Sequence, residues 1–155
     1  MKKKIVLSLL LICLCSCSTK EEVVETFELS YQEIEIIPGK DFQSSALKDE
    51  ELNFMELSSC AFDGNDKVYT YENMEITVSP LDGKDIVYSV YFLNDRITTK
   101  EGVKITDDKE TMIETYGENY KNINNKYSYL KGDVLLSFII ENDIIISIEY
   151  MYSNN

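Results

Sequence analysis

The cysteines are the side chains of this 155-residue chain that offer the widest choice of chemistry. Cys13, Cys15 and Cys17 occupy alternate positions in the stretch ICLCSCS, and Cys60 is the only other cysteine. Thiols form disulfides, bind metal ions, act as nucleophiles when ionised, or carry lipid. The residues around the first three cysteines decide which of these roles applies.

The sequence lacks the other common catalytic sets. It contains no histidine, which excludes Ser-His-Asp and Cys-His catalysis and histidine metal sites. It has no glycine-rich phosphate loop. The neighbouring acids Asp107 and Asp108 suit a helix N-terminus better than a glycosidase site, and there is no tryptophan to stack on a sugar. We therefore expect no enzyme, no metal and no cofactor; an enzyme using Cys60 or carboxylates is the alternative.

One short stretch, DGNDK at 63–67, is similar to a calcium-binding loop. It lacks the glycine at position six and the distal glutamate of such loops. Lys67 also stands where an oxygen ligand is needed. We interpret the stretch as a surface turn.

The segment with the clustered cysteines is laid out like an export signal. Residues 2–4 are lysines, and residues 5–14 form an apolar run. A positive end followed by a short apolar segment is typical of a secretory signal peptide, and this run is too short to span a membrane. We expect residues 1–16 to be the signal peptide.

The end of this signal resembles the lipobox of bacterial lipoproteins. Leu14 stands three residues before Cys17, with the small residues Cys15 and Ser16 between them. The resemblance implies that Cys17 carries a diacylglycerol thioether and becomes the first mature residue, with acyl chains such as palmitate as the anchor. It also implies a place on the outer face of the cytoplasmic membrane in a Gram-positive cell envelope. A plain secretory signal cut elsewhere is the alternative.

The mature chain would be small and strongly acidic. Cleavage before Cys17 leaves 139 residues with 12 basic and 28 acidic side chains, a net charge of −16. That length suffices for one compact domain. The charge repels nucleic acid and anionic lipid, so we expect no nucleic-acid partner and a membrane contact through lipid alone. Cys60 would be the single free thiol, either a small buried apolar side chain or, alternatively, a redox or intermolecular disulfide site.

The sequence predicts an internal repeat. Residues 17–30 are polar and acidic and are predicted to form a lipidated tether, followed by one globular domain over 31–155. Shifting the chain by 58 residues aligns 71–92 with 129–150 without a gap. Two tandem repeats, 31–95 and 96–155, are therefore predicted. Chance similarity between two strand-rich stretches is the alternative.

Each repeat contains three predicted strands separated by turn residues. Aspartate, asparagine and glycine between β-branched runs are typical of hairpins. Shorter strands are predicted at 33–37 and 102–105. The longer strands are expected near 67–72, 74–80 and 86–93, and again near 126–131, 133–140 and 144–151.

Helices are predicted ahead of each set of three strands. The second begins after its N-cap Asp107 and ends at Gly117. The first is placed at 41–51, with 49–58 as the alternative that the offset suggests. The apolar stripe of the second helix is Met112, Ile113 and Tyr116. The predicted fold class is α+β: two tandem (β)-α-β-β-β repeats that form one antiparallel curved sheet with helices on one face.

Alternation along the strands assigns their faces. The side predicted to pack on the helices carries Ile86, Tyr88, Val90 and Phe92, and in the second repeat Ile144, Ile146, Ile148 and Tyr150. The opposite side carries repeated serines, which we interpret as a solvated or ligand-facing surface. The partner-binding residues predicted on that open face are Tyr69, Tyr71, Tyr91, Tyr127 and Tyr129. That these tyrosines merely cover a sheet is the alternative.

Parts of the sequence resemble three groups of known proteins. The helix stretch DKETMIETYG followed by strands is similar to a unit of the SmpA/OmlA-type outer-membrane lipoproteins, and the tandem arrangement is similar to β-lactamase inhibitory protein. The segments SSCAFDGNDKVYTYENMEI, DIVYSVYFLNDRITTKEGVKI and ETYGENYK resemble an uncharacterised lipoprotein family of low-GC Gram-positive anaerobes. These resemblances imply the tandem-repeat fold and the cell-envelope location, and no chemistry.

The sequence thus leads to two functional expectations. The first is a non-catalytic binding module that meets a protein or an envelope polymer through its open sheet face. The alternative is a structural or assembly factor of an envelope complex, as the resemblance to the SmpA-type lipoproteins implies.

Overall fold

The computed structural model describes residues 25–42, 47 and 51–153, which form ten strands and one helix. Two strands near the start are β1 (Leu29–Tyr31) and β2 (Ile34–Ile36). The remaining strands and the helix, in chain order, are β3 (Asn53–Ser58), β4 (Asn65–Thr70), β5 (Met74–Leu81), β6 (Lys84–Phe92), α1 (Lys109–Tyr116), β7 (Lys121–Ile123), β8 (Lys126–Lys131), β9 (Val134–Glu141) and β10 (Ile144–Tyr152).

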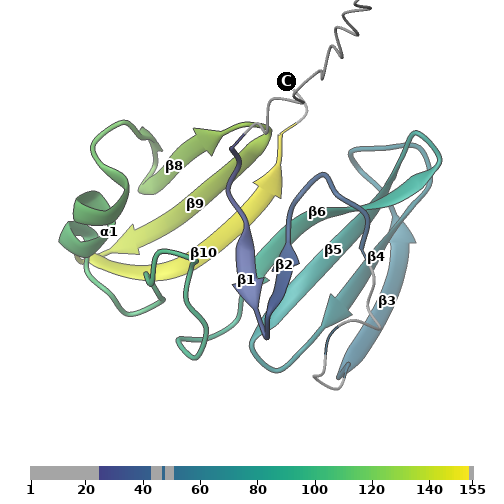
Figure 1. The fold of residues 1–155 in the computed structure, drawn as a ribbon, viewed down its shortest axis with the longest axis horizontal. Coiled ribbons are helices and arrows are strands. Elements are labelled where there is room, and N and C mark those ends of the chain that lie inside the picture. Colours follow the sequence, from purple (N-terminus) through teal and green to yellow (C-terminus); the bar gives the residue numbers. More distant parts are fainter. Residues whose placement is uncertain (1–24, 43–46, 48–50, 154–155) are drawn as a thin grey trace, which may run out of the picture.

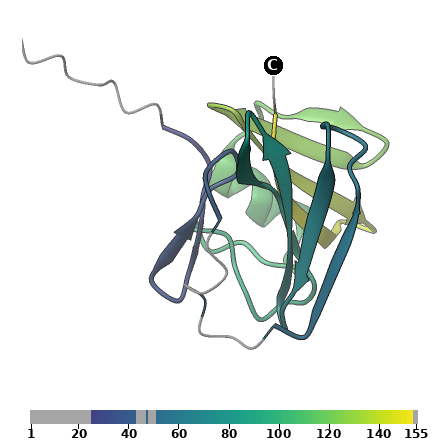
Figure 2. The ribbon, with the colours of Figure 1, turned by 90° about the vertical axis from the view of Figure 1, so that its right-hand side faces the viewer.

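Eight of these strands form one antiparallel sheet in the order β3-β4-β5-β6-β10-β9-β8-β7. The sheet consists of two meanders, β3 to β6 and β7 to β10, which meet where β6 pairs with β10. The β1–β2 hairpin lies across the middle of one face, and α1 lies at the end that carries β8 to β10 (Figure 1). Seen from the side, the hairpin and α1 both cover this same face, which we call the inner face (Figure 2).

The six long strands predicted from the sequence are confirmed to within two residues at each end. Their hairpins close through the expected turn residues, because asparagine, aspartate and glycine tolerate positive φ. Asp82 and Gly83 have φ values of 51° and 78°, and Asn142 and Asp143 have values of 50° and 63°. Two consecutive residues with positive φ match the twist of the strands that they join.

The predicted fold class is wrong. The protein is mostly β, with a large antiparallel sheet and, among the described residues, one short helix in place of helices covering one face of an α+β repeat pair. The alternative helix at 49–58 is replaced over 53–58 by strand β3, and the predicted strand at 102–105 is a loop. Most of the helix predicted at 41–51 lies outside the described residues. Met55, Glu56 and Leu57 favour helices intrinsically, but pairing with β4 overrides that preference.

The faces predicted for the third long strand of each repeat, now β6 and β10, are wrong in part. Each of these two strands contains a β-bulge. In β10 the register runs from Ile145 opposite Ile140 to Ser147 opposite Ile139, which leaves Ile146 as an extra residue. An extra residue reverses the alternation beyond it. Ile145 is therefore buried at 0% exposure, whereas Ile146, predicted to be inward, is 43% exposed. Ile144 is likewise predicted to point inward, but it is 40% exposed.

Strand β6 contains the corresponding bulge at Tyr88. Thr77 lies opposite Ser89, and Val78 lies opposite Val87. Val87 consequently joins the core at 2% exposure, and Tyr88 packs edge-on against Phe62, with ring centroids 5.5 Å apart.

The core lies on the inner face and is crossed by a ladder of large side chains. Register places Tyr69, Ile76, Val90, Tyr150, Leu136 and Tyr129 in successive strands of one row. The packed domain begins before the predicted boundary at Tyr31. Leu29 in β1 has 0% exposure, and Phe27 packs on Tyr116 with ring centroids 6.0 Å apart. Residues 25–30 are thus part of the packed domain.

Helix α1 begins one residue later than predicted. Asp108 is the N-cap: its carboxylate accepts a hydrogen bond from the Thr111 backbone N–H at 2.8 Å, and this bond lowers the pKa of the Asp108 carboxyl. Asp107 instead accepts from the Lys104 N–H at 2.9 Å. The predicted apolar stripe is confirmed, because Met112 is buried and Ile113 and Tyr116 pack against the core.

Candidate binding surface

The face of the sheet opposite α1 carries a continuous row of uncharged side chains, which we call the apolar row. Direct register pairs connect its members across seven strands, from β3 to β8. The members are Met55, Val68, Thr77, Ser89, Met151, Leu135 and Leu130. In a protein with 28 acidic and 15 basic side chains, a row of seven uncharged positions is a distinct feature of the sheet. Met55 and Leu130 at its two ends are exposed, whereas Val68 and Ser89 within it are buried.

A second row, the polar row, runs beside it across all eight strands. Its members are Asn53, Thr70, Glu75, Tyr91, Glu149, Ser137, Ser128 and Lys121. Glu149 forms an ion pair at 3.3 Å with Lys126, and Tyr91 is 38% exposed at the centre of the row. Together the two rows define an outer face that none of the described elements covers.

Hydroxyl groups connect the strands of this outer face. The Ser79 hydroxyl donates to the Asp66 carboxylate at 2.6 Å, and the Ser128 and Ser137 hydroxyls are 2.9 Å apart. The predicted outward orientation of the repeated serines is correct, yet Ser79, Ser89, Ser137 and Ser147 are all buried by larger neighbours. Their hydroxyls therefore stabilise pairing between strands rather than offering themselves to a ligand.

Only one of the five tyrosines predicted for the open face is exposed there. Tyr91 lies in the polar row, but Tyr71, Tyr127 and Tyr129 are buried in the core at 2%, 7% and 4% exposure. Tyr69 also points inward and stacks between Phe42 and Phe54, with ring centroids at 5.3 and 5.1 Å. The outward orientation predicted for these four is wrong, because they share the parity of Ile76 and Leu136 across the ladder.

Burial raises the pKa of three tyrosines on the inner face. Loss of solvent raises the pKa of Tyr129 to about 12, and burial raises the pKa of Tyr116 and Tyr150 even further above its ordinary value. The Tyr129 hydroxyl donates to the Gly117 carbonyl at 2.8 Å, which ties β8 to the end of α1. These groups stay neutral at physiological pH and serve packing rather than proton transfer.

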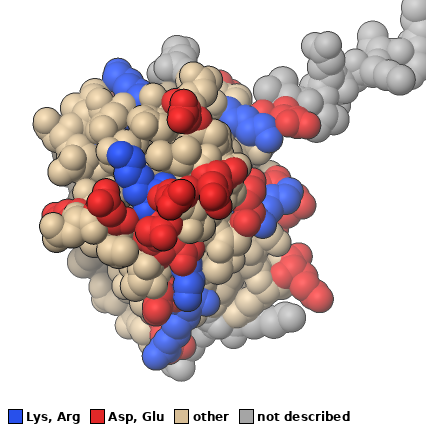
Figure 3. Space-filling model, turned by 90° about the vertical axis from the view of Figure 1, so that its left-hand side faces the viewer, with Lys and Arg blue, Asp and Glu red and all other residues tan. Residues whose placement is uncertain are grey.

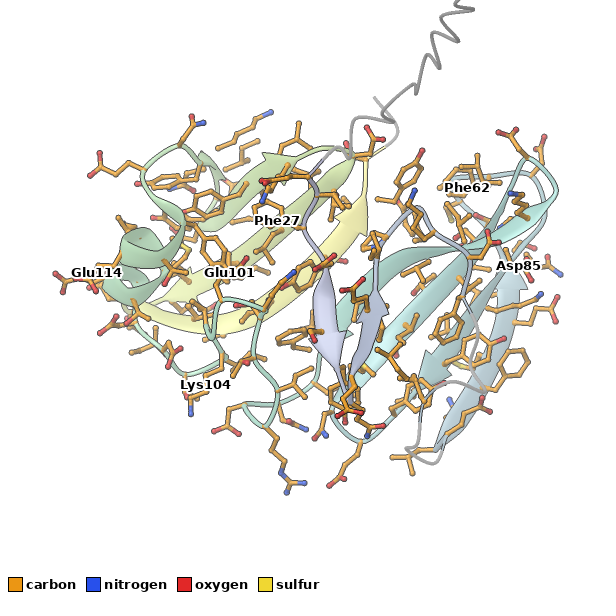
Figure 4. The ribbon with its side chains drawn as sticks, viewed as in Figure 1. Phe27, Phe62, Asp85, Glu101, Lys104 and Glu114 are labelled. Carbon is orange, nitrogen blue, oxygen red and sulfur yellow. The ribbon has the colours of Figure 1, made fainter. Side chains whose placement is uncertain are left out.

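Acidic side chains gather in a band, with a few lysines, across the end of the molecule where α1 lies (Figure 3). A shallow hollow there has a volume of about 520 Å³ and is lined by Asp108, Glu110, Glu114 and Asp143 beside Lys109. Glu114 points away from the sheet, whereas Glu101 lies over it (Figure 4). No group of three acids or thiols among the described residues is arranged to hold a metal ion.

The remaining sequence-predicted sites fall in different places. Cys60 is exposed in the loop between β3 and β4, so its interpretation as a buried apolar residue is wrong. The DGNDK stretch is half turn and half strand: Asp63 and Gly64 lie in that loop, and Lys67 in β4 pairs with Asp85. Cys17 lies outside the described residues. Within the described part of the chain, no helix is long and apolar enough to cross a membrane.

Sequence reasoning missed the exposed edge strand β3. All six residues of β3 are exposed, and Leu52, Phe54, Met55 and Leu57 have exposures between 45% and 63%. The stretch NFMELS lacks the β-branched residues and the alternation that mark the other strands. Its only strand signal is a short, mostly apolar stretch, interrupted by Glu56, between an asparagine and two serines.

Comparison with known proteins adds no relative. The chain matches no protein-family model, no curated protein and no solved structure to a significant degree.

Proposed function

We propose that this protein is a lipid-anchored, extracellular, non-catalytic binding module that meets its partner through the outer face of its sheet. The observation that carries the binding role is the apolar row, which extends from Met55 to Leu130 without a charged side chain. Contiguous apolar surface rimmed by polar groups is typical of protein interaction sites. The neighbouring polar row supplies such a rim, with Glu149 in its ion pair with Lys126 and the exposed Tyr91.

The anchoring part of the proposal rests on the sequence before the domain. Residues 5–14 and the lipobox-like Leu14-Cys15-Ser16-Cys17 support acylation of Cys17. The first described residues, Glu25 and Thr26, contact the β8–β9 turn: Glu25 pairs with Lys131 at 3.0 Å, and Thr26 donates to the Lys131 carbonyl. The seven residues between Cys17 and Glu25 would then connect the lipid to this end of the domain.

The binding role is tested by removing apolar side chains from the outer face. A variant with Leu130→Ser, Leu135→Ser and Tyr91→Ser is compared with Leu93→Ser, which removes an apolar side chain of similar exposure outside the two rows. Partners are cross-linked on intact cells and recovered by affinity capture. We expect the triple variant to lose the specific partner and Leu93→Ser to retain it, with both proteins equally folded by circular dichroism.

Equal recovery by the triple variant and the control would refute binding through the outer face. If the recovered partners belong to membrane complexes that disassemble when the protein is deleted, the role of an assembly factor is favoured over that of a simple binding module.

The anchor is tested separately with Cys17→Ala. We expect this variant to lose incorporation of radiolabelled palmitate and globomycin-sensitive processing, because the acylated thiol is gone. Labelling that persists in Cys17→Ala would show that Cys17 is not the acylated residue.

A further inference from the structure

The two edges of the eight-stranded sheet are protected very differently. β7 is only three residues long and begins with Lys121, which is how natural sheets limit pairing with other chains. β3 at the other edge has six residues, all exposed, with no lysine and no proline. An edge strand of this length, with Glu56 as its single charged side chain, is a template for an added strand that neutralises that charge.

The register shows which backbone groups of β3 face the open edge. The Ser59 N–H donates to the Gly64 carbonyl at 2.9 Å, so this position forms a hydrogen-bonded pair with the neighbouring strand. Alternate residues of an antiparallel strand direct both backbone groups to the same side. Phe54, Glu56 and Ser58 therefore direct their N–H and C=O groups away from β4, toward solvent.

Apolar side chains flank this row of backbone groups on both faces. Met55 and Leu57, exposed by 48% and 47%, lie on the outer face, and Met55 is the first member of the apolar row. Phe54, exposed by 45%, lies on the inner face against Tyr69. An added strand would cover apolar surface on both sides while pairing its backbone.

Charge decides between the possible occupants. Residues 51–70 carry Glu51, Glu56, Asp63 and Asp66 against Lys67, which is already paired with Asp85. A second copy would bring the same acidic hairpin against this one, in a chain of net charge −13. The open edge of β3 is complementary to a different kind of segment. Such a segment has basic side chains beside Glu56 on the inner side and apolar ones beside Met55 and Leu57 on the outer side.

We propose that β3 is a docking site for an extended basic and apolar segment of a partner protein, which adds to the sheet as a ninth, antiparallel strand. Main-chain hydrogen bonds to Phe54, Glu56 and Ser58 hold the segment, and its side chains select for charge. This site shares Met55 with the outer-face surface but depends on backbone groups at one edge rather than on side chains across the sheet.

The experiment uses the full-length protein in detergent and a short synthetic peptide in which lysine alternates with valine and threonine. Hydrogen exchange read by mass spectrometry with fragmentation is expected to show protection at the amides of Phe54, Glu56 and Ser58 on peptide binding. A peptide with glutamate in place of lysine is expected to bind about tenfold more weakly, or worse.

A matched pair of variants isolates the contribution of one backbone N–H group to peptide binding. Glu56→Pro and Glu56→Ala both lose the carboxylate, but only proline removes the outward N–H, while the hydrogen bonds of neighbouring residues to β4 are kept. We expect Glu56→Pro to bind the lysine peptide about tenfold more weakly than Glu56→Ala. If Glu56→Pro is unfolded by circular dichroism, Ser58→Pro compared with Ser58→Ala makes the same test.

Three results would overturn the proposal: equal affinities for the proline and alanine variants, binding without protection in β3, or equal binding of the glutamate peptide. Sedimentation that shows a dimer of the protein, lost in Glu56→Pro, would assign the edge to a second copy instead. The triple outer-face variant is expected to bind the peptide normally, so failure of the edge site and failure of the proposed function are distinguishable.

Discussion

At the scale of single residues, the Thr99 hydroxyl connects three parts of the inner layer. It is buried at 2% exposure, accepts a hydrogen bond from the Val103 N–H at 3.0 Å and lies 2.7 Å from the Tyr116 hydroxyl. Tyr116 in turn donates to the Glu101 carboxylate at 2.8 Å. Because that hydroxyl has a single proton, the Thr99 hydroxyl must be the donor toward Tyr116. The loop before α1 is thus fixed to the helix by one threonine.

Replacing Thr99 by valine should destabilise the protein more than replacing it by serine. Valine keeps the shape but leaves the Val103 N–H and the Tyr116 oxygen without their buried partner, which costs about 1–3 kcal/mol. Serine keeps the hydroxyl and loses only a methyl group, worth about 1 kcal/mol. Urea unfolding followed by circular dichroism gives both values. A smaller effect for Thr99→Val than for Thr99→Ser would show that the hydrogen bonds contribute little.

The tyrosines show what a sequence predicts at this scale and what it does not. Their abundance, eleven in the chain, correctly indicates that they matter to the sheet. Their side of the sheet depends on the parity carried through each turn, which residue types alone do not determine. The side chains of Tyr71 and Tyr129 therefore point into the core rather than toward solvent.

At the scale of elements, the bulges explain why alternation assigns some faces correctly and others wrongly. Ile148 and Tyr150 follow the bulge of β10 and point inward as predicted. Counting in twos assigns Ile144 and Ile146 to the same side, yet both are exposed. The stretch IIISI offers four equivalent isoleucines, so nothing in their types indicates where the extra residue falls.

The bulge predicts opposite results for two adjacent isoleucines. Ile145→Ala should destabilise the protein by about 2–5 kcal/mol, because it leaves a cavity in the core. Ile146→Ala should change stability by about 0.5 kcal/mol or less, because its side chain is on the surface. Chemical unfolding of both variants provides the comparison, each serving as control for the other. The reverse order would mean that β10 is regular and that the bulge is absent.

At the scale of the whole molecule, the six long strands follow from sequence because hairpin signals are local. Asn142-Asp143 and Asp82-Gly83 specify their turns within a few residues. The fold class does not follow, because it depends on β3, whose strand pairing arises from contact with β4 rather than from its own residues. The same holds for Phe27 and Leu29, which lie in a polar stretch of sequence but complete the core.

The buried tyrosines predict how the molecule responds to alkali. The ordinary tyrosine pKa of 10.0 applies to the unfolded chain, whereas burial raises the pKa of Tyr129 to about 12 in the folded protein, and those of Tyr116 and Tyr150 higher. Above pH 10.0 the unfolded chain loses protons that the folded protein retains. Stability is therefore fully present below that pH and falls as pH rises toward the folded values.

We expect the free energy of unfolding in urea to be nearly constant from neutral pH up to about pH 9 and to fall steeply above about pH 10. Tyrosinate absorbance from Tyr116, Tyr129 and Tyr150 should rise only together with unfolding. Tyr129→Phe should weaken the dependence on pH, because it removes one group with a raised pKa. If all tyrosines ionised in one step while near-ultraviolet circular dichroism stayed native, the inner tyrosines would be accessible to solvent, and their burial in the core would be contradicted.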